Sequence, residues 1–248
     1  MARSSDFNFQ IKGTARQAVT GHLGTTVGSI LFYCITALLL SNITVSIFPG
    51  SDVGSTIGFE AVNFIIQLFL GLLAYGINYQ HLLLVYGQNT TFGDLFAGFR
   101  RGVNDRVIKV TAVLALISFC CTLPATLVMS TCADAAEMIE KMYLIAPLYI
   151  AGIILDIWFT LSFSQCYYLL ADFETLGAKD CLRDSARMMK GNRGRLFVLI
   201  LSFLPLALLG LLSFGIADLW TASYETAAEA SFYQWLTASG RKDSDSKY

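Results

Sequence analysis

The residues most able to do chemistry in this sequence are ionisable and amide side chains set inside long apolar stretches. They are Asp156, Asp218, Glu225, Glu229, Asn78, Gln80, His81 and Gln165. Placing such groups in a low-dielectric medium is costly, so each one is a candidate for a functional site. Together they form a candidate intramembrane polar site, for which hydrogen bonding between helices is the plainer interpretation of the amides and the histidine.

The four carboxylates fall into two pairs. Asp156 and Asp218 each lie two residues before a tryptophan, and Glu225 and Glu229 are four residues apart on one helical face. If the aspartates face a cavity they could bind a cation or a proton, whereas near an interface they would be solvated groups beside aromatic rings. Like charges repel at the spacing of the glutamates, which fits an aqueous groove.

Catalysis in a membrane usually needs a metal cluster or an activated nucleophile, and the sequence offers neither in recognisable form. Its two histidines, His22 and His81, lack a second histidine or a carboxylate at helical metal-ligand spacing. The patterns H-E-x-x-H, G-x-S-x-G, Walker A and G-x-G-x-x-G are absent. We therefore expect no metal, no cofactor and no enzymatic activity.

Composition indicates that lipid is the main solvent of the chain. Of its 248 residues 55% are hydrophobic and 14% are charged, and the mean hydropathy is +0.58. These values are too apolar for an ordinary soluble domain of this length. The net charge of -1 gives no basic excess that would favour binding to nucleic acid.

Five apolar stretches are long enough to cross a hydrocarbon core, which takes about 20 helical residues. They are residues 23–48, 61–93, 110–133, 142–171 and 196–217. A sixth segment, 215–236, carries Asp218, Glu225 and Glu229, so it must pack inside the bundle or stop partway. The sequence predicts an all-α transmembrane bundle of about six membrane segments, five full spans plus a more polar last one.

The distribution of basic residues predicts orientation. With six segments, sixteen of the seventeen Lys and Arg residues lie before the first span, between the second and third, between the fourth and fifth, or in the tail. The loops at 49–60 and 131–141 carry five acidic residues and only Lys141. By the positive-inside rule both termini are cytoplasmic and these loops, with Cys132, are external. A five-span chain would instead place the tail outside.

The construction unit of the domain is predicted to repeat three times. Each unit, at 8–86, 90–172 and 176–238, consists of a short amphipathic interfacial helix, a glycine turn and a transmembrane hairpin. The turns fall at Gly21, Gly102 and Gly191, and residues 1–240 form one membrane domain followed by a polar cytoplasmic tail at 239–248. In the second unit Phe92, Leu95, Phe96 and Phe99 have the spacing of one α-helical face.

Basic residues of the interfacial helices are candidate contacts for lipid headgroups. They are Arg16, Arg100, Arg101, Arg183, Arg187 and Lys190. Ordinary connecting helices beneath the bundle would have the same pattern, so the alternative stays open at this point.

Two stretches carry a family likeness. Ile11-Lys12 is followed by Ala15-Arg16 and Gly21, and the run from Asp184 to Gly191 leads into Leu196-Phe197. They resemble the bacterial membrane family known as domain of unknown function 975, although Ser223-Tyr224 stands where that family usually has Pro-Tyr. The resemblance implies a bacterial cytoplasmic-membrane protein, distantly similar to membrane domains found beside glycerophosphodiester phosphodiesterases, and it assigns no catalytic residue.

The sequence thus leads to two functional hypotheses. The first is a non-catalytic protein that acts through contacts with membrane lipids, a partner membrane protein or a second copy of itself. The alternative is a transporter or channel for an ion or small amphiphile, with a path lined by the four carboxylates.

Overall fold

The computed structural model describes residues 4–47, 53–130, 132, 135–173 and 175–245, and this part of the chain is helical without any strand. In chain order its helices are α1 (Ser4–Val19), α2 (Leu23–Ile47), α3 (Val53–Val85), η1 (Phe92–Phe99), α4 (Asn104–Ser130), α5 (Ala135–Glu140), α6 (Met142–Phe163), α7 (Cys166–Asp172), α8 (Ala178–Met188), α9 (Arg193–Leu201), α10 (Leu204–Leu212) and α11 (Ile216–Asp245).

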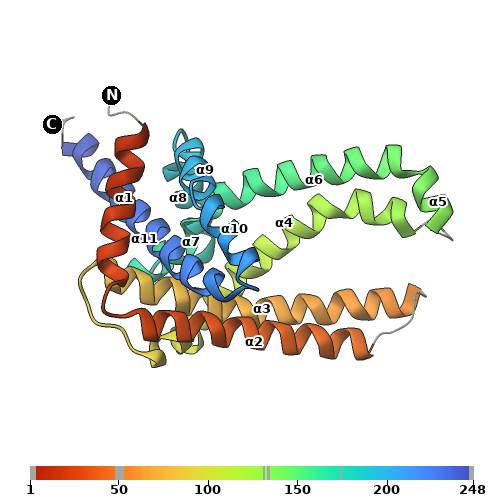
Figure 1. The fold of residues 1–248 in the computed structure, drawn as a ribbon, viewed down its shortest axis with the longest axis horizontal. Helices are drawn as coiled ribbons and strands as arrows, with labels where there is room; N and C mark the ends of the chain where they lie inside the picture. The colour runs from red at the N-terminus through yellow and green to blue at the C-terminus, as the bar shows by residue number, and fades with distance from the viewer. Residues whose placement is uncertain (1–3, 48–52, 131, 133–134, 174, 246–248) are drawn as a thin grey trace.

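Two long helical hairpins form the frame of the molecule. α2 pairs with α3, α4 pairs with α6, and the closed ends of both hairpins lie at the same end of the molecule (Figure 1). We call this the loop end, and we call the opposite end, which holds both termini, the terminal end. Five helical stretches are long and apolar enough to cross a membrane: Leu23–Ile47, Gly58–Val85, Asn104–Met129, Met142–Asp172 and Arg193–Leu212. The predicted all-α membrane bundle of about six segments is confirmed.

A packed cap of helices covers the terminal end. Ile11, Ala15 and Val19 of α1 are buried against Leu196 and Phe232, in a cluster that joins α1, α9 and α11. Glycines Gly21, Gly102 and Gly191 precede α2, α4 and α9, and each has a positive φ, a conformation that glycine adopts without strain. These turns stand where the sequence predicts them, while the threefold repeat itself stays a prediction.

The last hairpin, formed by α10 and α11, is shorter than the other two. A break at Ser202 and Phe203 separates α9 from α10, and Pro205 lies at the start of α10. Leu219, near the start of α11, packs against a cluster that contains Ile30 and Leu73. The turn between α10 and α11 therefore lies beside the middle of α3, short of the loop end (Figure 1).

Residues 92–99 correct one prediction. They form a 3-10 helix in which Leu95 and Gly98 are buried, whereas Phe92, Phe96 and Phe99 are 44%, 41% and 38% exposed. Leu95 packs into a cluster with Leu73 and Ile77 of α3, whereas the rings of Phe92, Phe96 and Phe99 contact one another. The predicted stripe is therefore wrong for Leu95, which does not share the exposed face of the three phenylalanines. The main chain of η1 packs directly against α3, because a Cβ on Gly76 would overlap the carbonyl of Leu95.

Candidate functional site

Three arginines converge on one pocket at the terminal end. Arg100, Arg101 and Arg106 line a cavity of about 400 Å³ together with Tyr75 and Tyr79. We call it the arginine pocket; its walls come from α3, η1, α4 and α7, with Ala97, Gly102, Val103, Leu170 and Ala171 completing the lining. Two of the predicted headgroup residues, Arg100 and Arg101, are thus brought together in one concave site.

Short-range contacts fix the position of Arg100. Its guanidinium lies 3.3 Å from Asp94 Oδ1 and 5.8 Å from the centre of the Tyr79 ring. Asp94 also accepts hydrogen bonds from the backbone N–H and the hydroxyl of Thr91, both at 2.9 Å, which caps η1. The carboxylate of Asp94 therefore both caps the N-terminus of η1 and orients Arg100.

Arg106 is held by main-chain carbonyls. It donates hydrogen bonds to Gly102 O at 2.9 Å and to Phe173 O and Leu176 O at 3.3 Å. These contacts satisfy donors without cancelling the positive charge. Sequence reasoning placed Arg106 on the cytoplasmic side but did not select it, and it missed Tyr75 and Tyr79. The spacing of the two tyrosines is the signal that could have found them, because residues four apart share a helical face, and their rings stack here at 6.3 Å.

The other predicted headgroup residues lie elsewhere. Arg16 lines a separate groove of about 730 Å³ between α1 and the last hairpin, whose walls include Leu209, Trp220 and Tyr224. Arg183, Arg187 and Lys190 are exposed on or just after α8, and Arg187 lies 3.7 Å from Asp184. The six basic residues are therefore distributed over three surfaces.

The amide and histidine side chains of the predicted polar site make structural hydrogen bonds. His81 Nδ1 lies 2.8 Å from Ile77 O, and its Nε2 lies 3.2 Å from Ser223 Oγ of α11. Asn78 donates to Ala74 O at 2.8 Å, and Gln80 donates to Thr91 O at 2.9 Å. Each of these bonds joins a helix to itself or to a neighbouring segment.

Gln165 forms a further local bond, between α6 and α7. Its amide donates to Ser164 Oγ at 2.8 Å, and its buried Oε1 has no hydrogen-bond partner among the described residues, a property it shares with Gln80 Oε1.

The structure does not gather the four carboxylates into one path. Ser118 of α4 donates to Asp156 Oδ1 of α6 at 2.6 Å, in the middle of the second hairpin. Asp218 is exposed at the α10–α11 turn, where its side chain lies against Gly210, while Glu225 and Glu229 are half-buried further along α11. Within the described residues, no group of three His, Cys, Asp or Glu side chains could hold a metal ion.

The apolar helices and their hairpin arrangement define the class of the protein, which is a multi-pass membrane protein. A family model described as "Protein of unknown function (DUF975)" matches residues 6–240, and the chain belongs to this family. A search of the curated proteins found no match, and neither did a search of the solved structures.

Proposed function

We propose that the chain is a non-catalytic membrane protein that binds an anionic phospholipid in the arginine pocket. The observation that carries the proposal is the convergence of Arg100, Arg101 and Arg106 on one cavity. Guanidinium groups match the geometry of phosphate oxygens and form short, charge-assisted hydrogen bonds with them.

The charge balance of the arginine pocket favours an anion. Asp94 is the acidic group that pairs with Arg100, and within the part of the chain that the structure describes no carboxylate forms an ion pair with Arg101 or Arg106. Two positive charges are therefore left without an ionic partner inside a partly apolar concavity. A phosphodiester would offset one of them and accept hydrogen bonds from both.

The surroundings of the pocket suit a lipid rather than a free phosphate. Phe99, directly before Arg100, and Phe96 are exposed, and Phe99 contacts the exposed Phe69 of α3 edge-on at 5.6 Å. These aromatic contacts link the segment next to the pocket with Phe69, which lies in the apolar stretch Gly58–Val85 of α3. A phosphate in the arginine pocket would thus place acyl chains over aromatic side chains, whose burial is favourable.

The proposal includes a location. We place the protein in the bacterial cytoplasmic membrane with both termini in the cytoplasm, because the basic residues of the terminal end then face the leaflet surface that attracts Lys and Arg. Contact with a partner membrane protein or a second copy of the chain is a further expectation of the same proposal.

Native mass spectrometry of the gently extracted protein tests the lipid site. We compare retention of phosphatidylglycerol and phosphatidylcholine by the wild type, by Arg100→Gln with Arg101→Gln, and by Arg183→Gln with Arg187→Gln. The α8 pair is a matched control, because it removes the same charge from the same end of the molecule outside the pocket. We expect the first pair to weaken phosphatidylglycerol binding about thirtyfold, since each of the two basic residues near an anionic lipid contributes about 1 kcal/mol.

Two results would count against the proposal. Equal losses in the two double variants would show diffuse attraction to the basic surface and no defined site. Retention of phosphatidylcholine as strong as that of phosphatidylglycerol would show that the headgroup charge is not recognised. Unchanged thermal unfolding midpoints in both variants establish that any loss of lipid does not reflect loss of the fold.

A further inference from the structure

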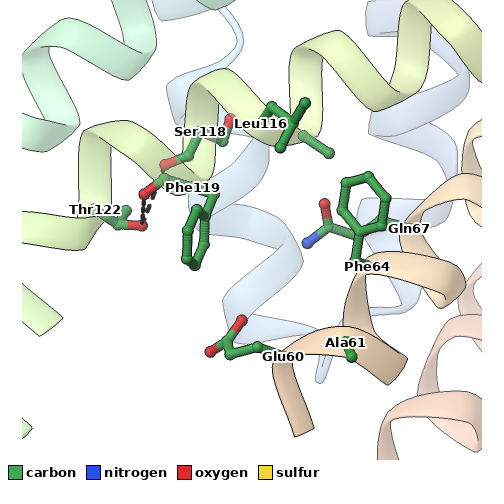
Figure 2. Close-up of a pocket in the computed structure, with 9 residues that line it drawn as sticks. Glu60, Ala61, Phe64, Gln67, Leu116, Ser118, Phe119 and Thr122 are labelled. Carbon is green, nitrogen blue, oxygen red and sulfur yellow. Dashed lines mark hydrogen bonds between the residues drawn. The ribbon is translucent and has the colours of Figure 1, made fainter. Parts of the chain in front are cut away.

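A second cavity opens between the two long hairpins in their loop-end half. α3 contributes Glu60, Ala61, Phe64 and Gln67, and α4 contributes Ala115, Leu116, Ser118, Phe119 and Thr122 (Figure 2). Its volume of about 570 Å³ lies in the range of sites that hold small molecules. We call it the loop-end cleft; none of its lining residues lines the arginine pocket.

The lining of the loop-end cleft is apolar except for a few polar groups with distinct positions. The hydroxyl of Ser118 donates a hydrogen bond to Asp156, and the hydroxyl of Thr122 donates to Ser118 O and Phe119 O within its own helix. The amide of Gln67 and the carboxylate of Glu60 project toward the space between α3 and α4 (Figure 2). These two side chains are therefore the polar groups that a bound molecule could engage.

Glu60 is the charged residue of this cleft. No Lys, Arg or His of the described residues forms an ion pair with it, and Lys141, a basic residue at the loop end, pairs with Glu137 at 2.6 Å. A carboxylate beside an apolar wall attracts a cation that brings its own apolar surface. The rings of Phe64 and Phe119, on opposite walls, add the quadrupole attraction that aromatic faces offer to cations.

We propose that the loop-end cleft binds a cationic amphiphile, with the positive group at Glu60 and the apolar body between Phe64 and Phe119. This site is separate from the anionic phospholipid site proposed above, and it has the opposite charge preference. The cavity lies between two membrane hairpins, so an amphiphile could reach it from the bilayer.

The test uses the tetraphenylphosphonium cation and the tetraphenylborate anion, which have nearly the same shape and opposite charge. Binding of each ion to the purified full chain in phosphatidylcholine nanodiscs is measured by equilibrium dialysis. We expect saturable binding of the cation, a loss of about tenfold in affinity for Glu60→Gln, which corresponds to about 1.4 kcal/mol, and a similar loss for Phe119→Ala. Glu140→Gln, a change of equal charge at the same end, should bind as the wild type does.

Several outcomes overturn the proposal. Absence of saturable cation binding by the wild type does so, as does unchanged affinity in Glu60→Gln, and equal saturable binding of the anion rejects the charge preference. Because Phe119→Ala removes a large side chain, its loss supports the proposal only when its unfolding midpoint and its phosphatidylglycerol retention match those of the wild type.

Discussion

His81 of α3 and Ser223 of α11 meet in the interior of the molecule, with His81 Nε2 3.2 Å from Ser223 Oγ. The same hydroxyl lies 2.8 Å from Thr26 Oγ1 of α2, and all three side chains are buried. This polar contact fastens the last hairpin to the first one. His81, the one histidine of the predicted polar site, therefore has a structural role as a link between α3 and α11.

Ser223→Ala should therefore destabilise the protein. The substitution removes a hydroxyl from a buried pair of partners, and a buried polar atom left unsatisfied costs about 1–3 kcal/mol. The measurement is the thermal unfolding midpoint in detergent. Ser231→Ala is the matched control, because Ser231 is also buried in α11 but bonds to Ala227 O of its own helix. Equal midpoints for the two variants would show that the bond to His81 contributes nothing.

Gly76→Ala should displace η1 from α3. An added Cβ at Gly76 would overlap the main chain of Leu95, whereas a Cβ at Gly28 of α2 meets nothing within 4 Å. Overpacking of this kind costs about 1–3 kcal/mol or more. We expect a lowered unfolding midpoint and weaker phosphatidylglycerol retention for Gly76→Ala, because Arg100 and Arg101 directly follow η1 and would move with it. Gly28→Ala should behave as the wild type, and a Gly76→Ala protein that does so as well would contradict the packing described for η1.

Removal of the carboxylates should leave lipid binding unchanged. Asp156 and Asp218 lie outside the arginine pocket, so Asp156→Asn with Asp218→Asn should retain phosphatidylglycerol as the wild type does. Ser118→Ala takes the hydroxyl from Asp156 and should lower stability by about 1 kcal/mol. Flux of an ion in proteoliposomes that disappears in the double aspartate variant would instead favour the transport hypothesis.

Thiol reactivity should differ sharply between the two ends of the molecule. A side-chain hydrogen bond with Cys166 and burial together raise the pKa of Cys181, so its thiol stays protonated at pH 8 and reacts slowly. Cys132 lies beyond α4 at the loop end and is half-buried. In a variant that keeps only these two cysteines, a membrane-impermeant maleimide added to intact cells should label Cys132, and Cys181 should react slowly even after the cells are permeabilised. Labelling of Cys132 only after permeabilisation would reverse the proposed orientation.

Hydropathy was sufficient to predict the frame of the fold. Apolar length identified the helices from Leu23, Gly58, Asn104 and Met142 onward, because satisfying main-chain hydrogen bonds within a membrane leaves few alternatives to helix. The same signal could not reveal that the final hairpin turns beside the middle of α3. The position of this turn depends on contacts such as the packing of Leu219 against the cluster that contains Leu73, which joins segments far apart in the sequence.

The candidate sites were only partly predictable for the same reason. The charge pattern selected Arg100 and Arg101 but could not place Tyr79 beneath Arg100, since that contact requires η1 to fold back on α3. The spacing of the residues in η1 does not distinguish Leu95, which is buried against α3, from the exposed Phe96 and Phe99. The loop-end cleft, which joins Glu60 to Phe119 across two hairpins, has no local sequence signature.

Electron cryomicroscopy of the full chain in nanodiscs that contain phosphatidylglycerol tests the central claim most directly. We predict density for a phosphate within hydrogen-bonding distance of Arg101 and Arg106, with acyl density over Phe99 and Phe69. An arginine pocket without lipid density, in a map that resolves bound lipid against α8 or in the Arg16 groove, would contradict the account.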